Sequence, residues 1–111
     1  MKIFKELIYN EETNQTVLID DREFSDCVNH QLQVIRERAK ELILEGAPEY
    51  KQRNAALGLL SDAEANAILA HIESIRIISN QKEEEILAVT WDGQESTRAA
   101  ACDAVQAVRW D

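Results

Sequence analysis

The stretch GAPEYKQRNAALGLLSDAEANAILAHIESI, residues 46–75, decides the fold, because it holds one helix stop and two helix starts. Gly46 suits the left-handed conformation that ends a helix, and Pro48 suits the first turn of the next one. In the capping box that opens at Ser61, the serine hydroxyl accepts from the backbone N–H of Glu64, and the Glu64 carboxylate reaches back to the serine N–H. The stretch therefore predicts a short helix, a bend and a long helix.

Apolar residues recur at helical spacing on both sides of this bend. The first stripe predicts a helix over about 26–45, capped by Ser25 or Asp26. The second stripe is clear up to the polar residues Ser79 and Lys82 and resumes beyond them. Two such helices with a short connection are expected to pack antiparallel. The stripes consist of Val28, Leu32, Ile35, Ala39 and Leu42, and of Ala65, Ile68, Ile72 and Ile75.

The two ends of the chain are predicted to add a small β element and a last helix. KIFKELIY (2–9) and QTVLI (15–19) read as strands around a polar turn, although the first run also fits a helical period. ILAVTWDG (86–93) alternates like a strand that could join them, and its Asp-Gly pair signals a turn. ESTRAAACDAVQAVRW (95–110) reads as a helix. Its expected buried residues are Ala101, Cys102, Val105 and Val108.

The predicted fold is one mainly α domain with a minor β element. It consists of a helical hairpin or small helical bundle plus a short N-terminal β-hairpin. The expected parts are a β-hairpin and connection over 1–24, a helical hairpin over 26–88, and a C-terminal turn and helix over 89–111. A chain of 111 residues suits a single domain. Because 45% of the residues are apolar but only 5% are aromatic, the core must be mainly aliphatic.

The acidic net charge disfavours some classes of binding partner. The net charge is −9 and the sequence pI is about 4.7, so nucleic acid and anionic membrane surfaces are disfavoured. No segment approaches the roughly 20 apolar residues of a membrane span, and Lys5 and Glu6 interrupt any signal-like run. We expect synthesis in the cytoplasm with reduced thiols, and either a protein partner or self-association.

A zinc site is the sharpest chemical alternative. Cys27 and His30 lie three residues apart, and His71 and Cys102 supply one further ligand of each kind. Two cysteines and two histidines can hold tetrahedral zinc, which would make the protein a small metal-binding interaction module. However, the second pair lacks the short spacing of structural zinc motifs. The favoured interpretation is that both cysteines are small core residues and that no cofactor is bound.

Catalysis is not expected. A nucleophilic thiolate needs a base or a positive field, but Asp26 and Asp103 stand beside the two cysteines and would raise their pKa. The carboxylate runs are typical of solvated helix faces. Three glycines, at positions 46, 58 and 93, cannot build a phosphate-binding loop. The protein is therefore predicted to be non-enzymatic.

The interface candidates are aromatic and basic side chains. Tryptophan is enriched at binding hot spots but is also heavily buried on average, so each tryptophan is equally a candidate to seal the core. Basic residues near the bend could meet an acidic partner or pair with nearby glutamates. The candidates are Tyr50, Lys51, Arg53, Trp91 and Trp110.

Two runs resemble a known group of proteins. The run PEYKQRNAALG (48–58) with its following helix resembles small proteins and C-terminal segments from bacteriophage and prophage tail-fibre regions. VTWDGQESTRAAACDAVQAVRW (89–110) is similar to the same group. Tyr50 stands where tryptophan is more usual. The resemblance covers about half of the chain, leaves 1–25 uncovered and includes no catalytic motif. It implies a structural or assembly role at a tail or tail fibre, and association with the virion.

Overall fold

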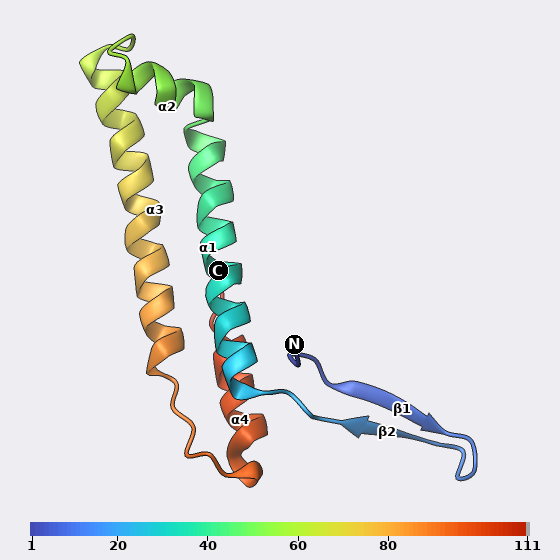
Figure 1. The fold of residues 1–111 in the computed structure, drawn as a ribbon. Helices are drawn as coiled ribbons and strands as arrows, with labels where there is room; N and C mark the ends of the chain where they lie inside the picture. The colour runs from blue at the N-terminus through green and yellow to red at the C-terminus, as the bar shows by residue number, and fades with distance from the viewer. Residues whose placement is uncertain (111) are drawn as a thin grey trace.

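The computed structural model describes residues 1–110 and shows an elongated molecule of 70 × 32 × 20 Å. Helices α1 and α3 lie side by side, α2 joins them at one end, α4 packs on α1 at the other, and a β-hairpin projects sideways (Figure 1). The mainly α prediction with an N-terminal β-hairpin is confirmed. The elements are β1 (Glu6–Asn10), β2 (Gln15–Ile19), α1 (Phe24–Gly46), α2 (Glu49–Ala56), α3 (Asp62–Ala88) and α4 (Glu95–Gln106).

Helix α1 begins earlier than the sequence predicted. Its N-cap is Glu23, not Ser25 or Asp26. The backbone N–H of Glu23 donates to the carbonyl oxygen of Lys2 at 2.8 Å. The Asp26 carboxylate accepts from the backbone N–H of Lys2 at 2.9 Å instead of capping the helix. The start of α1 is therefore set by the N-terminal segment lying across it, a contact that local capping rules do not include.

Gly46 does not end α1 in the left-handed conformation that was predicted. It is the last helical residue, and the glycines with positive φ are Gly58 and Gly93. A Cβ at Gly46 would overlap the imidazole of His71 on α3. His71 Nε2 lies 2.9 Å from the carbonyl oxygen of Leu42, to which it donates. The glycine thus permits close approach of α3 to α1, in place of the predicted role as a backbone stop.

The capping box at the start of α3 is confirmed in its main contact. Ser61 Oγ accepts from the backbone N–H of Glu64 at 3.2 Å. The reciprocal contact differs from the prediction, because the Glu64 carboxylate accepts from the Ser61 hydroxyl at 3.0 Å and not from its backbone N–H. The helix start is nonetheless the one that the sequence signalled.

Helix α3 continues through the polar interruption and reaches Ala88. Ser79 is small enough to be buried in the stripe, and Ile86 beyond it is fully buried. The third strand considered over residues 86–91 does not form, since in the described part of the chain the sheet contains β1 and β2 alone. Burial of Ile86 on the helical stripe outweighs the local alternation of apolar residues that suggested a strand.

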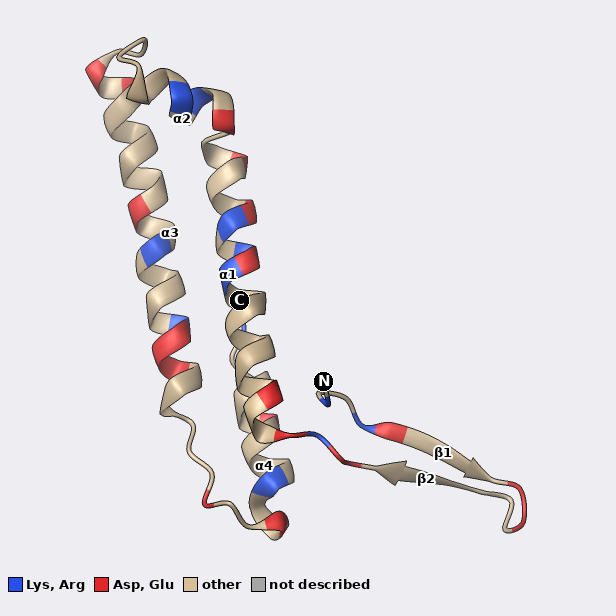
Figure 2. Ribbon diagram, in the orientation of Figure 1, with Lys and Arg blue, Asp and Glu red and all other residues tan. Residues whose placement is uncertain are grey.

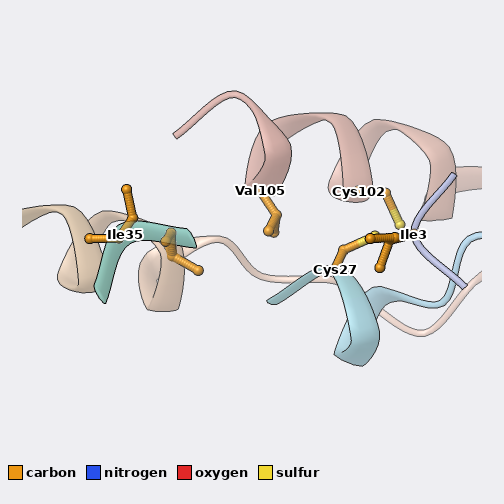
Figure 3. Packing of buried hydrophobic residues seen from close by; sticks show 6 residues of the cluster. Ile3, Cys27, Ile35, Cys102 and Val105 are labelled. Atoms are coloured by element: carbon orange, nitrogen blue, oxygen red, sulfur yellow. The ribbon is translucent and has the colours of Figure 1, made fainter. Parts of the chain in front are cut away.

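The core lies where α1, α4, the end of α3 and the N-terminal segment meet (Figure 3). Cys27 on α1 and Cys102 on α4 are both fully buried there, which confirms that they act as small core residues. Gln31 Nε2 donates to the carbonyl oxygen of Val108 at 2.7 Å and holds the C-terminal segment against α1. The buried cluster contains Ile3, Cys27, Ile35, Ile86, Cys102 and Val105.

Candidate interaction surface

The β-hairpin is built by its turn and by regular antiparallel pairing. Five residue pairs connect the strands, from Glu6 opposite Ile19 to Asn10 opposite Gln15. In the turn, Asn14 takes a left-handed φ of 54°, which asparagine tolerates better than most residues. The Asn10 side chain accepts from the backbone N–H of Glu12 at 2.9 Å. These contacts explain why a polar turn between two β-forming runs closes as a hairpin.

Every residue of both strands is solvent-exposed, although most of the strand residues are apolar. Opposite residues in an antiparallel pair point to the same side of the sheet, so the register separates two faces. One face carries Ile8, Val17 and Ile19, and the other carries Leu7, Tyr9 and Leu18. The hairpin therefore presents apolar side chains to solvent on both faces.

The base of the hairpin is fixed by a buried arginine. Arg22 is only 2% exposed and binds the Asp20 carboxylate through Nε at 2.9 Å and Nη2 at 2.7 Å. Its Nη1 donates to Gln106 Oε1 and Asp103 Oδ1 on α4, both at 2.8 Å. The guanidinium lowers the pKa of Asp20 to about 2, mainly by hydrogen bonding to its carboxylate. The chain leaving β2 is thus anchored to α4, while the strands extend away from it.

A groove of about 650 Å³ lies beside this base, between the residues before β1, helix α1 and the C-terminal segment. Its apolar lining includes Phe4, Val34 and Trp110. The charged lining is mostly basic, and Asp103 is the one acidic side chain among the lining residues. Three of these basic side chains also pair with carboxylates, Arg22 with Asp20 and Asp103, Lys5 with Asp103, and Arg38 with Glu41. The basic and histidine residues are Lys5, Arg22, His30, Arg38 and Arg109.

The structure does not bring the predicted interface residues together. Tyr50, Lys51 and Arg53 are exposed on α2, at the opposite end of the helical hairpin from α4 (Figure 1). Trp91 is half-buried, with its ring centroid 5.7 Å from that of Phe24, and its Nε1 donates to the carbonyl oxygen of Gln94. Trp110 is half-buried, packs on the core and also lines the groove. Both tryptophans therefore cover edges of the core.

The four possible zinc ligands do not form one site. Cys27 and Cys102 lie together in the core, His30 lines the groove, and His71 contacts Leu42 near the other end of α1. Within residues 1–110, no three side chains of the metal-binding types His, Cys, Asp and Glu are grouped closely enough to share an ion. Burial, together with the neighbouring Cys102 thiol, raises the pKa of Cys27 to about 12, so this thiol is protonated at neutral pH.

Sequence reasoning missed three features of this surface: Arg22, the groove and the two-sided exposure of the hairpin. Arg22 lies within the acidic run that was read as a polar connection. The hairpin did carry a signal, since Leu7-Ile8-Tyr9 and Val17-Leu18-Ile19 are unbroken apolar runs. Such runs are typical of strands that are covered on both faces. The groove had no local signal, because its lining comes from both ends of the chain.

None of the helices in the described residues has the length and apolar character needed to cross a membrane.

Comparison with known proteins assigns no family to the chain. The chain matches no protein-family model, no curated protein and no solved structure.

Proposed function

We propose that this protein is a non-enzymatic interaction protein that uses its N-terminal β-hairpin to dock in an assembly. The observation that carries the proposal is the hairpin itself, with Leu7 73% exposed on one face and Val17 51% exposed on the other. Unbroken apolar strands that are covered on neither face are expected to gain stability when a partner covers them.

Isolated two-stranded hairpins are at best marginally stable in water, so this one needs support. The support within the chain is at the base, where Arg22 joins Asp20 to α4. The Gln106 side chain also donates to the carbonyl oxygen of Ile3, at 2.7 Å. Anchoring both ends of the hairpin to α4 presents its strands without burying them. Such an arrangement suits docking, because little of the binding free energy is then lost to ordering the base.

A tail or tail-fibre component of a phage or prophage is the partner that we propose from the resemblance of residues 48–58 and 89–110 to tail-fibre-region proteins. The hairpin lies in the part of the chain that this resemblance does not cover. A structural role in such an assembly would place the protein in the virion after its synthesis in the cytoplasm. The helices would then serve as an arm that carries the hairpin, in a molecule that is 70 Å long overall.

Co-purification with a tail-fibre protein from the same phage or prophage tests this proposal. The hairpin variant Leu7→Thr/Leu18→Thr keeps β-forming residues but removes apolar surface from one face. The matched control is Leu57→Thr/Leu69→Thr, because these leucines are similarly exposed, at 66% and 64%, near the α2 end. We expect the hairpin variant to lose at least tenfold in affinity and the control to bind normally. Unchanged binding by the hairpin variant would contradict the docking role, and absence of binding by the unaltered protein would contradict the tail assignment.

A further inference from the structure

We infer that the partner covering the β1 edge is a second copy of this chain, joined β1 to β1 in an antiparallel pair centred on Ile8. The inference rests on the proposed function, since it assigns a partner to the open edge of the hairpin that docks in the assembly. It comes from three observations: the open edge of β1, the placement of charges along the hairpin, and the position of the basic groove.

The outer edge of β1 is available for pairing. Strand β2 borders β1 on one side, and no further strand of the described chain borders it on the other. The hairpin points away from the helices, so this edge is open along its length (Figure 1). Unpaired N–H and C=O groups on such an edge form hydrogen bonds readily with another extended strand.

The edge of β2 is a weaker site for the same pairing. Its C-terminal end continues directly into Asp20, whose carbonyl oxygen already accepts from Arg98 of α4 at 2.5 Å. A β2-to-β2 pair centred on Val17 would form no pair of opposite charges, since β2 carries no charged residue and Asp20 beyond it is already bound to Arg22. The β1 edge carries both signs of charge, so it can complement a copy of itself.

The hairpin carries both signs of charge at its base, where Lys5 precedes β1 and Glu6 begins it, whereas its tip carries the acidic residues Glu11 and Glu12 (Figure 2). In an antiparallel pair, the tip of one copy lies beside the base of the other. Two-fold symmetry makes every contact occur twice, so a favourable pair of residues counts double.

The register can be chosen by comparing the few that symmetry allows. In an antiparallel pair, facing residues have their side chains on the same side of the sheet. The two-fold axis of a symmetric pair must therefore pass beside one residue of β1, and the alternative registers are those centred on each successive residue. Centring on Ile8 places Leu7 opposite Tyr9 of the second copy and brings Lys5, just before β1, beside Glu11, the first residue of the turn. All apolar residues of β1 then face apolar residues.

The neighbouring registers lose these matches. Centring on Leu7 places Glu6 opposite Ile8, which buries a carboxylate against an apolar side chain. Centring on Tyr9 places Ile8 opposite Asn10 and brings Glu6 and Leu7 beside the acidic turn residues, where like charges are unfavourable. Of these three registers, the one centred on Ile8 pairs every apolar residue of β1 with another apolar residue and brings Lys5 near Glu11.

This register also provides an acidic ligand for the basic groove. Glu12 lies in the turn, one residue beyond Glu11, so it leaves the paired strands near Phe4 and Lys5 of the other copy, which line the groove. The acidic tip of each hairpin thus lies near the groove beside the base of the other. Charge complementarity between tip and groove favours a second copy over an unrelated apolar strand as the occupant.

Cysteine cross-linking tests the register directly. We expect Ile8→Cys to form a disulfide-linked dimer when the protein is oxidised with diamide, because the two residues face each other across the two-fold axis. Val17→Cys is the matched control, since Val17 pairs with Ile8, has similar exposure and lies on the other strand. We expect Val17→Cys to remain largely monomeric on a denaturing gel. The native cysteines are buried in both variants.

Charge reversal tests the pairing in solution. Sedimentation equilibrium should show a dimer of the unaltered chain, and Lys5→Glu or Glu11→Lys should each weaken it roughly tenfold, since each change affects two facing pairs. The double variant Lys5→Glu/Glu11→Lys restores opposite charges and should recover most of the affinity. Recovery would support the proposed pair, and additive weakening would overturn it.

The remaining outcomes separate this inference from the proposed function. A dimer that is lost in Leu7→Thr/Leu18→Thr but does not cross-link through Ile8→Cys would overturn the register and keep the docking hairpin. A strict monomer at the highest soluble concentration would overturn the second copy as partner, while the fibre-protein experiment still decides the proposed function. A dimer unaffected by every hairpin variant would overturn this inference, because the helices would then form the interface, and the fibre-protein experiment would again decide the proposed function.

Discussion

Ile35 on α1 and Leu7 on β1 are aliphatic side chains with the same number of atoms, yet Ile35 is fully buried and Leu7 is 73% exposed. The helical part of the molecule buries its apolar stripes between α1, α3 and α4. The β-hairpin has runs that are at least as apolar, and it buries neither face. The comparison indicates that the helices are stabilised within the chain, whereas the hairpin is held at its base and left open for another surface.

The largest difference in stability between the two regions is expected for substitutions in the core. Ile35→Ala should reduce the free energy of unfolding by about 3 kcal/mol, because it removes buried contacts and leaves a cavity. Leu7→Ala should change it by less than about 0.5 kcal/mol, as an exposed substitution. Urea unfolding of dilute protein, followed by circular dichroism at the helical bands, measures both. Equal losses would mean that the hairpin belongs to the cooperative core.

Removing the anchor between the two regions should have the second largest effect on stability. Arg22→Ala leaves Asp20 and Asp103 without their shared partner and is expected to lower the free energy of unfolding by about 2 kcal/mol. Arg36→Ala is the control, because its ion pair with Glu83 is on the surface and is worth less than about 1 kcal/mol. Thermal melts of the two variants give the comparison, and a smaller effect for Arg22→Ala than for Arg36→Ala would refute the anchoring role.

Acid should weaken the same anchor in a defined range. The folded pKa of Asp20 is about 2 against an ordinary value of 3.8, so its contribution to stability is complete above about pH 4 and is lost as the pH falls towards 2. The loss is at most about 2 kcal/mol. Unfolding measured across this range should be less steeply pH-dependent in Asp20→Asn than in the unaltered protein. Identical pH profiles would show that Asp20 does not titrate differently on folding.

The smallest expected effect on the free energy of unfolding concerns the packing of α3 on α1. Whether the substitution stabilises or destabilises the protein tests this packing. Gly46→Ala should destabilise the protein by about 1 kcal/mol, because the new methyl group displaces His71 from its hydrogen bond to Leu42. In a His71→Ala background the same change should stabilise by up to about 1 kcal/mol, since alanine favours a helix over glycine. Thermal melts of the four proteins form a double-mutant cycle. The same sign in both backgrounds would mean that the close approach has no energetic role.

Much of the secondary structure could be predicted because its causes are local. The stripe at Ile68 and Ile75, the Ser61 cap and the turn at Gly93 each depend on residues within a few positions of one another. The predictions failed where a distant group competed with a local rule. The Asp26 carboxylate, predicted as a possible cap of α1, accepts instead from the backbone N–H of Lys2. Gly46, predicted as a backbone stop, instead leaves space for the imidazole of His71.

The sequence by itself determined that the chain is mainly helical, that its N-terminal part forms a β-hairpin and that a long helix begins after Ser61. Periodicity, turn residues and capping are sufficient for these properties. Only the tertiary structure decided that Arg22 is buried, that a basic groove exists and that the hairpin is uncovered on both faces. The physical reason is distance along the chain: Arg22 and Gln106, which meet at 2.8 Å, are 84 residues apart. No local pattern can specify such a contact, and the exposed hairpin depends on what the folded helices leave unpartnered.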